Sequence, residues 1–208
     1  MNCDRIAPWY RWIEFAAFGP ALMRRRLAFL GEIADAKRVL VVGEGDGRFL
    51  ARLVEQNRNA SIDYVDLSGR MLELARHRAG ESRITFHHGN VLDVSLPEST
   101  FDLIVTHFFL DCFDAAALPE IVNRLAATAL PHARWLISEF RQPPGGLAGA
   151  WAALWLGTMY RFFGFTTGLR TRGLVDHRPV LASAGFRLIH EQKAWMGMIV
   201  SELWRRAA

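Results

Sequence analysis

A short apolar run that leads into three glycines constrains the fold of this chain more than any other feature. Residues Val39–Val42 are all apolar and mostly β-branched, and glycines follow at positions 43, 45 and 47. A strand with apolar residues at every position is typical of the centre of a parallel sheet that helices cover on both faces. The glycines predict a tight turn, and a helix that resumes at Arg48 would direct its first N–H groups to the same place. We therefore expect a nucleotide-type binding site at the carboxyl edge of an α/β sheet.

The spacing of the glycines separates this turn from the dinucleotide-binding fingerprint. That fingerprint is G-x-G-x-x-G, whereas this chain has G-x-G-x-G followed directly by Arg48. Two acids, Glu44 and Asp46, lie inside the turn. Carboxylates repel a pyrophosphate and attract a cation, so the turn favours a ligand with positive charge, such as a sulfonium and an amino group. Both observations count against the alternative of an NAD-type oxidoreductase.

Asp66 occupies the position where a ribose-binding acid is expected. It ends the predicted strand Ser61–Val65 and lies 19 residues after Gly47 (66 minus 47). A carboxylate at the tip of the second strand can accept hydrogen bonds from both ribose hydroxyls. The segment from Asp66 to Ser68 also predicts the cap of a helix that runs to about Arg78. The capping role and the ribose-binding role are compatible.

These segments resemble the class I S-adenosylmethionine-dependent methyltransferases of the small-molecule type. Residues 39–50 resemble the first motif of that family, and Asp66-Leu67-Ser68 followed by Met71-Leu72 resembles the second. An Ala-Gly-Phe at 184–186, before a predicted final hairpin, extends the resemblance over about residues 7–204. The resemblance implies S-adenosylmethionine as the cofactor. It also implies an α/β, Rossmann-like fold with a seven-stranded, mostly parallel sheet (order 3-2-1-4-5-7-6), helices on both faces and an antiparallel last strand.

The resemblance further implies a set of cofactor-binding residues. In that family the turn after the third strand usually carries an Asp that holds the adenine amino group, and the matching position here is Asn90. The side-chain carbonyl of an asparagine can still accept a hydrogen bond. The predicted cofactor-binding residues are Tyr10, Gly43, Glu44, Gly45, Asp46, Gly47, Asp66, Leu67, Met71, Asn90, Val91 and His107.

The chain departs from the family pattern two residues before the first glycine. An acid that helps to hold the methionine amino group is usual there, and this chain has Val41. Glu44 or Asp46 could take that role. The residues at 41 and 90 also leave open a different class of protein, one that binds S-adenosylmethionine or S-adenosylhomocysteine without turnover.

The loop that follows the predicted strand Phe101–Thr106 is expected to face the transferred methyl group, because it leaves the sheet beside the glycine turn. Its polar residues His107 and Asp111 are the predicted catalytic residues. A general base is needed only if the nucleophile of the acceptor holds a proton near neutral pH. Further candidates for this role are Glu139, Tyr160 and His177. A purely structural role is open for each of them.

Aromatic residues are expected to surround the acceptor. The predicted walls of the substrate pocket are Trp9, Phe108, Phe109, Trp155 and Tyr160. Such walls favour a small, partly apolar acceptor over a protein or a nucleic acid. The aromatic segment around Trp155 could equally belong to the hydrophobic core.

The predicted elements form a single methyltransferase domain over residues 1–208. Residues 1–36 are expected to form an N-terminal helical cap, either as a lid over the cofactor edge or packed on the sheet, and residues 37–141 the cofactor-binding core. Residues 142–184 are expected to form an aromatic helical insert on the substrate side, and residues 185–208 a C-terminal hairpin. The helices predicted outside the nucleotide-binding motifs are Ala7–Phe18, Ala21–Leu30, Ala115–Leu130, Leu147–Phe163 and Leu174–Ala184.

Composition narrows the class of partner. The chain has 208 residues and a net charge of +4, and its arginines are scattered apart from Arg24–Arg26, so no nucleic-acid footprint is indicated. The mild basicity instead favours an anionic small molecule or contact with a membrane surface. Cys3 and Cys112 have no partner at disulfide-framework or zinc spacing, and His87-His88 lacks a third metal ligand. We therefore expect no metal, and the oligomeric state stays open.

The apolar segments do not predict insertion into a membrane. The first residues are not followed by the apolar region of a signal peptide, so a cytoplasmic protein is expected. The long apolar stretch at 147–165 is interrupted by Gly157 and Arg161, whereas a transmembrane helix needs about 20 uninterrupted apolar residues. This stretch is therefore expected to form a buried or interfacial helix.

Overall fold

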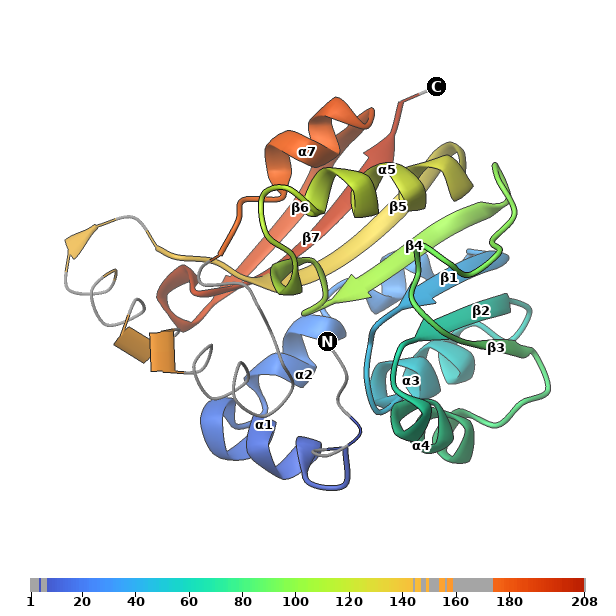
Figure 1. Ribbon diagram of the computed structural model, residues 1–208, viewed down its shortest axis with the longest axis horizontal. Coiled ribbons are helices and arrows are strands. Elements are labelled where there is room, and N and C mark those ends of the chain that lie inside the picture. The colour runs from blue at the N-terminus through green and yellow to red at the C-terminus, as the bar shows by residue number, and fades with distance from the viewer. Residues whose placement is uncertain are drawn as a thin grey trace.

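The fold is organised around one mixed sheet. The computed structural model describes residue 4 and residues 7–143, 145, 146, 149, 154, 155, 157, 158 and 174–207 (Figure 1). The seven strands lie in the order β3-β2-β1-β4-β5-β7-β6, and β7 is antiparallel to both of its neighbours. This arrangement confirms the fold expected from the sequence. The strands are β1 (Arg38–Val42), β2 (Ser61–Asp66), β3 (Ile84–His88), β4 (Phe101–His107), β5 (Ala129–Phe140), β6 (Phe186–Ala194) and β7 (Ile199–Arg206).

Helices cover both faces of the sheet. Figure 1 shows α5 and α7 on one face and α3 and α4 on the other, with α1 and α2 near the carboxyl ends of β1 and β4. The described helices are α1 (Tyr10–Phe18), α2 (Ala21–Arg26), α3 (Arg48–Gln56), α4 (Gly69–Ala79), α5 (Leu118–Thr128) and α7 (Arg178–Ser183), with short 3₁₀ turns at Leu30–Ile33, Leu110–Cys112 and Trp195–Gly197.

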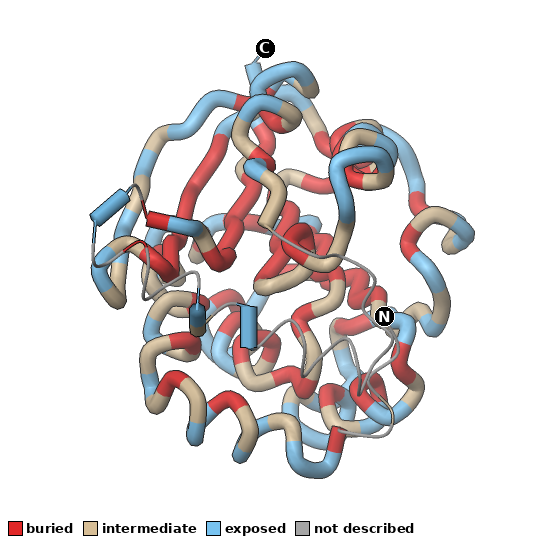
Figure 2. Tube along the Cα trace, turned by 60° about the vertical axis from the view of Figure 1, so that its left-hand side comes forward, coloured by how far each residue is buried: buried red, intermediate tan, exposed pale blue. Residues whose placement is uncertain are grey.

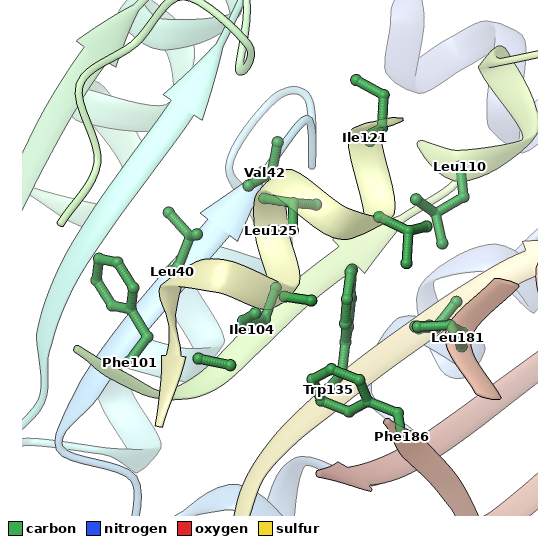
Figure 3. Packing of buried hydrophobic residues seen from close by; sticks show 14 of the residues in the cluster. Leu40, Val42, Phe101, Ile104, Leu110, Ile121, Leu125, Trp135, Leu181 and Phe186 are labelled. Carbon is green, nitrogen blue, oxygen red and sulfur yellow. The ribbon is translucent and has the colours of Figure 1, made fainter. Parts of the chain in front are cut away.

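The apolar run of β1 is buried from both sides. Leu40 and Val42 belong to the core beneath α5 and α7, which also contains Leu125 and Trp135 (Figure 3). Val39 and Val41 belong to the opposite core. Alternate side chains of a strand point to opposite faces, so a strand with helices on both sides needs an apolar residue at every position. Figure 2 shows this burial along the central strands, with most of the exposed chain at the periphery.

Several predicted boundaries differ from the structure. The helix expected to end at Leu130 ends at Thr128, and Pro131 lies inside β5 instead of after a helix. The pairing of β4 with β5 shifts register between Phe101 and Leu103, and a proline is tolerated at such an irregularity because its missing N–H leaves no ladder bond unmade. Similarly, α2 ends at Arg26 and α7 begins at Arg178. Most of the predicted helix 147–163 lies outside the described residues.

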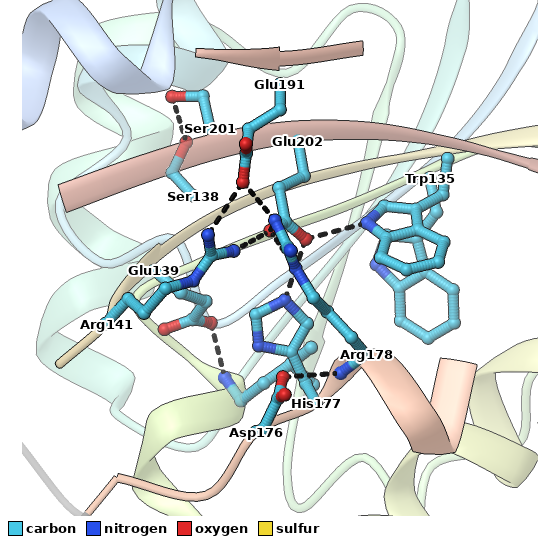
Figure 4. Close-up of polar contacts among 12 residues, drawn as sticks. Trp135, Ser138, Glu139, Arg141, Asp176, His177, Arg178, Glu191, Ser201 and Glu202 are labelled. Carbon is cyan, nitrogen blue, oxygen red and sulfur yellow. Dashed lines mark hydrogen bonds and ion pairs between the residues drawn. The ribbon is translucent and has the colours of Figure 1, made fainter. Parts of the chain in front are cut away.

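A buried carboxylate joins the two ends of the segment between β5 and α7. Glu202 of β7 is fully buried and pairs with Arg141, which follows β5, and with Arg178, which begins α7 (Figure 4). His177 Nε2 lies 2.9 Å from Glu202 Oε2, and the Trp204 indole donates to the same oxygen at 2.8 Å. Although burial raises the pKa of Glu202, hydrogen bonds and charge from His177 and Arg178 lower it to about 2 overall.

We predict that Glu202→Gln lowers the free energy of unfolding by about 3 kcal/mol at pH 7, because the partly buried Arg141 and Arg178 lose the charge of their buried partner. The lowered pKa stabilises the fold above the ordinary value of 4.5 and this contribution is lost as the pH falls toward about 2. Urea unfolding should therefore show the difference from wild type closing over that window. Glu55→Gln, in an exposed pair with Arg52, is the control and should change little. Equal stability of Glu202→Gln and wild type at pH 7 would contradict this role.

Candidate cofactor site at the carboxyl edge of the sheet

A cavity of about 210 Å³ lies at the carboxyl ends of β1 and β2. It is bordered by the glycine turn, by the loops that follow β2, β3 and β4, and by one residue of α1. Its lining residues are Tyr10, Val42, Gly43, Gly45, Val65, Asp66, Leu67, Met71, Gly89, Asn90, Val91, Phe108, Phe109, Cys112 and Phe113. Residues from six separate segments of the chain therefore meet at one edge of the sheet.

The glycine turn is held in a conformation that other residues adopt poorly. Gly43, Gly45 and Gly47 have φ values of 61°, 92° and 77°. A Cβ at Gly43 would overlap the Phe109 ring, and one at Gly47 would lie 2.5 Å from Ala75 Cα in α4. The turn therefore lets an aromatic ring and a second helix approach its backbone closely.

Asp66 presents its carboxylate to the cavity from the tip of β2. Its Oδ1 accepts the N–H of Ser68 at 2.8 Å, and the N–H of Gly45 also hydrogen-bonds to the carboxylate. Burial raises the pKa of Asp66 to about 6, although these two N–H groups act in the opposite direction. A carboxylate offers about four acceptor positions, so two N–H donors leave room for the hydroxyls of a ligand.

The loop after β3 forms the wall opposite the glycine turn. Asn90 Oδ1 accepts the N–H of Leu92 at 3.2 Å, which fixes the loop, and Val91 is buried. On the adjoining wall, the side chain of Ser68 accepts the N–H of Met71 at 3.2 Å and caps α4. The apolar residues Val91, Leu67 and Met71 thus line the same cavity as Asn90, a combination that suits a flat heterocycle with a polar edge.

The two acids inside the glycine turn do not line the cavity. Glu44 is almost fully buried, and its Oε1 accepts the N–H of Phe49 at 3.1 Å while Oε2 has no partner in the described part of the chain. Burial raises the pKa of Glu44 to about 7 even though the charge of Arg26 opposes the shift. Asp46 is paired with Arg48 at 2.8 Å and with Arg78 at 2.6 Å. Both carboxylates therefore have contacts within the protein, and neither is among the residues that line the cavity.

A buried ion-pair network connects the turn to the N-terminal helices. Glu14 of α1 pairs with Arg26 of α2 and with Arg48 at the start of α3. The pKa of Glu14 is lowered because these two arginines outweigh the effect of burial. On the same helix, the ring of Tyr10 lies over the turn, 3.6 Å from the position of a Cβ at Gly45. The network therefore holds α1 across the edge of the cavity.

The loop after β4 contributes aromatic walls, while its two predicted catalytic residues are not among those that line the cavity. His107 is buried, its ring centroid is 4.5 Å from that of Phe49, and burial lowers its pKa well below the ordinary value. Asp111 is also buried. Neither residue lines the cavity, whereas Phe108 and Phe109 do.

The other candidates for a general base have structural contacts. Glu139 Oε1 accepts the N–H groups of Phe109 and Leu110 at 3.0 and 2.8 Å and so fixes the aromatic loop. Burial and the neighbouring Asp111 raise the pKa of Glu139 well above the ordinary value. His177 is paired with Glu202 as described above, and Tyr160 lies outside the described residues.

The remaining predicted pocket residues lie apart from the cavity. Trp9 is 67% exposed. Trp155 packs edge-on against Phe18, with ring centroids 6.1 Å apart. His87 Nε2 lies 2.7 Å from Asp63 Oδ1, which gives that histidine a partner within the sheet.

Five lining residues were not predicted from the sequence. Val42 and Val65 immediately precede Gly43 and Asp66, so their position at the strand ends could have identified them. Gly89 directly follows β3 and could have been found in the same way. Cys112 and Phe113 lie at the end of a 3₁₀ turn, which brings them back to the cavity, and nothing in the sequence pattern distinguishes them from their neighbours.

The chain is similar to known methyltransferases. Residues 39–131 match the family described as "Methyltransferase domain". A demethylmenaquinone methyltransferase from Deinococcus radiodurans is 31% identical over 129 residues, which cover 61% of this chain and 53% of that protein. The matched region thus spans about half of the length of that relative.

Two solved structures share the whole architecture. The 1,6-didemethyltoxoflavin-N1-methyltransferase of Burkholderia thailandensis superposes with a TM-score of 0.70 at 18% identity, over 99% of this chain and 86% of that one. The N-methyltransferase NodS of Bradyrhizobium japonicum gives 0.64 at 16% identity, over 90% and 85% of the two chains. The chain therefore has the fold of these two methyltransferases, and its residues 39–131 match a methyltransferase-domain family, which confirms the resemblance drawn from its motifs.

We predict that Glu44→Gln stabilises the protein increasingly as the pH rises. The folded protein holds a proton on Glu44 up to about pH 7, whereas the unfolded chain releases it near the ordinary value of 4.5. The wild type therefore loses stability between these two pH values, by about 3 kcal/mol in all, and a neutral glutamine does not. Unfolding by urea at a series of pH values measures the difference, with the exposed Glu73→Gln as control. If the difference in stability between Glu44→Gln and wild type did not depend on pH, the raised pKa of Glu44 would be contradicted.

Proposed function

We propose that this protein transfers a methyl group from S-adenosylmethionine to a small, partly apolar acceptor. The observation that carries the proposal is the position of Asp66, a partly buried carboxylate at the tip of β2 that lines a cavity beside a glycine turn. The methyltransferase relatives and the shared fold support the same function.

The residues around the cavity fit the proposed cofactor part by part. Asp66 would accept hydrogen bonds from the ribose hydroxyls, and Asn90 with Val91, Leu67 and Met71 would hold the adenine. Gly43 and Gly45 carry no side chain of their own, and their backbone lines the cavity where the methionine part would pass. This assignment leaves the amino group without a carboxylate from the turn, since Glu44 and Asp46 are buried away from the cavity.

When bound, S-adenosylmethionine supplies an activated methyl group on a sulfonium, and the acceptor displaces it in line. The protein contributes orientation and the exclusion of water, which can account for much of the rate enhancement of such a reaction. Phe108, Phe109 and Phe113 form an apolar wall that would orient an acceptor and keep the site dry. Among the described lining residues, Tyr10, Asp66 and Cys112 are the ones that can titrate. We therefore assign no general base, and the proposed acceptor needs no proton removed by a histidine or a glutamate of the wall.

The aromatic wall also defines the acceptor class. Three phenylalanines beside a largely apolar cavity favour a flat or ring-containing molecule over a peptide. The relative from Deinococcus radiodurans is named as a demethylmenaquinone methyltransferase, so quinone-like compounds belong in the first panel of acceptors to be tested.

We predict that isothermal titration calorimetry shows binding of S-adenosylmethionine and S-adenosylhomocysteine and no binding of NAD. The acids of the turn and the absence of a third glycine at dinucleotide spacing disfavour a pyrophosphate. Binding of NAD without binding of either sulfur compound would contradict the proposal and indicate an oxidoreductase. Binding of the two sulfur cofactors without turnover across an acceptor panel would favour a binding protein that has kept the fold.

We predict that Asp66→Asn weakens the binding of S-adenosylhomocysteine more than about tenfold, because the ribose hydroxyls lose a charged acceptor. Wild-type affinity should also fall as the pH drops below about 6, where Asp66 takes up a proton, while the affinity of the variant should stay flat. Asp63→Asn is the matched control, since Asp63 lies on the same strand and pairs with His87 outside the cavity. Unchanged affinity in Asp66→Asn would refute the ribose assignment.

A further inference from the structure

The N-terminal helix carries large aromatic side chains on its outer side. Trp9, which caps the start of α1, and Trp12 and Phe15 within the helix are 67%, 61% and 58% exposed, and we call these three residues the aromatic face of α1. Their spacing of three residues puts them on one broad side of the helix, whereas Glu14 and Phe18 on the other side are buried. A group of exposed large apolar side chains on one element marks a surface that contacts something else.

The charge around the aromatic face is positive. Between residues 7 and 31 the sequence has a single acid, Glu14, and that acid is buried and neutralised by Arg26 and Arg48. Arg11 and Arg24 are exposed in the same region. The Arg11 guanidinium lies over the Trp12 ring at 5.6 Å from its centroid, so a cation and an aromatic ring share one position on the surface.

This combination fits one kind of partner best. Tryptophan and arginine side chains together suit the boundary between lipid headgroups and acyl chains, where the ring has an apolar side and the cation meets phosphate. A second copy of the chain would fit less well, because a twofold contact through this face would bring two positively charged rims together.

We propose that the aromatic face of α1 docks on the surface of a bilayer that contains anionic phospholipid. Trp9, Trp12 and Phe15 enter the boundary between headgroups and acyl chains, and Arg11 and Arg24 contact the headgroup phosphates. The β6–β7 turn adds a further contact at the other end of α1, where Met196 is 65% exposed.

Docking would also bring the cavity close to the membrane. Tyr10, which belongs to α1, lines the cavity, and an α-helix with its side chains is about 10–12 Å across. An apolar acceptor dissolved in the bilayer would therefore reach the cavity over a short distance. This consequence depends on the methyltransferase function proposed above, whereas docking itself does not.

Co-sedimentation with vesicles tests the proposal without cofactor or acceptor, so its outcome is independent of whether methyl transfer occurs. Wild-type protein should sediment with phosphatidylcholine vesicles that contain roughly 30% phosphatidylglycerol and much less with phosphatidylcholine alone. Binding should weaken in about 0.5 M salt, where charges are screened beyond a few ångströms. Wild-type protein that stays in the supernatant with anionic vesicles at low salt would overturn the proposal.

Substitution of the aromatic face identifies the docking element. Trp9→Ala/Trp12→Ala should bind anionic vesicles at least about tenfold more weakly, because each indole loses its buried apolar area. Leu188→Ala, which removes an exposed apolar side chain from β6, should bind like wild type. Circular dichroism and thermal unfolding would establish that the double variant is folded, as expected for substitution of exposed residues. Equal binding of the folded double variant and wild type would overturn the assignment to α1.

Two double variants that lose the same charge distinguish the effect of arginines near the aromatic face of α1 from the effect of the net charge of the protein. Arg11→Gln/Arg24→Gln should bind several-fold more weakly, at about 1 kcal/mol for each cation near the surface. Arg58→Gln/Arg187→Gln removes the same charge from exposed positions in the turn after α3 and in β6 and should bind nearly like wild type. An equal loss of vesicle binding in both double variants would overturn the proposal that Arg11 and Arg24 make specific contacts with the headgroups. Sedimentation velocity showing a wild-type dimer that Trp9→Ala/Trp12→Ala converts to a monomer would assign the aromatic face to self-association instead.

Discussion

The buried ion pairs around Glu14 determine how the N-terminal helices, the glycine turn and the cavity fit together. Glu14 lies between Arg26 and Arg48, and Arg48 in turn pairs with Asp46, which also pairs with Arg78. These residues come from α1, α2, the turn, α3 and α4, so one set of charges fixes five elements. Loss of a single partner would leave a buried charge unpaired, which commonly costs about 3–5 kcal/mol.

The same network explains why this turn differs from the family pattern. The acid usually found two residues before the first glycine is replaced by Val41, which is fully buried in the core. Acids are present inside the turn instead, yet Asp46 serves the arginines and Glu44 is enclosed by protein. The charges in the turn therefore stabilise the architecture of the site. Among the described residues that line the cavity, Asp66 is the one with a carboxylate side chain.

The position of α1 links the site to the outer surface. Its inner side carries Glu14 into the network and Tyr10 over the turn, while its outer side exposes aromatic residues. A helix held rigidly by buried charges can present an exposed face without distorting the cavity beneath it. The proposed membrane contact and the proposed cofactor site would thus share one nine-residue helix.

The sequence predicted the sheet and much of the cavity because these depend on local patterns. The apolar run of β1, the three glycines and the acid at the end of β2 each have a short-range signature. Packing between distant segments has no such signature. Nothing in the sequence shows that Glu14 meets Arg48, that His107 turns toward Phe49, or that Trp9 stays exposed, because each depends on how α1 and the loop after β4 settle on the sheet. The boundary of α5 was missed since Pro131 enters a strand through a register shift, which tertiary pairing imposes.

A crystal structure of the protein grown with S-adenosylhomocysteine tests the central claim most directly. We expect density for the ligand in the cavity, with both ribose hydroxyls on the Asp66 carboxylate and the adenine between Asn90 and Leu67. We also expect Glu44 and Asp46 to stay buried in their present contacts. A ligand held elsewhere on the protein, or one whose amino group is bound by either acid of the turn, would contradict it.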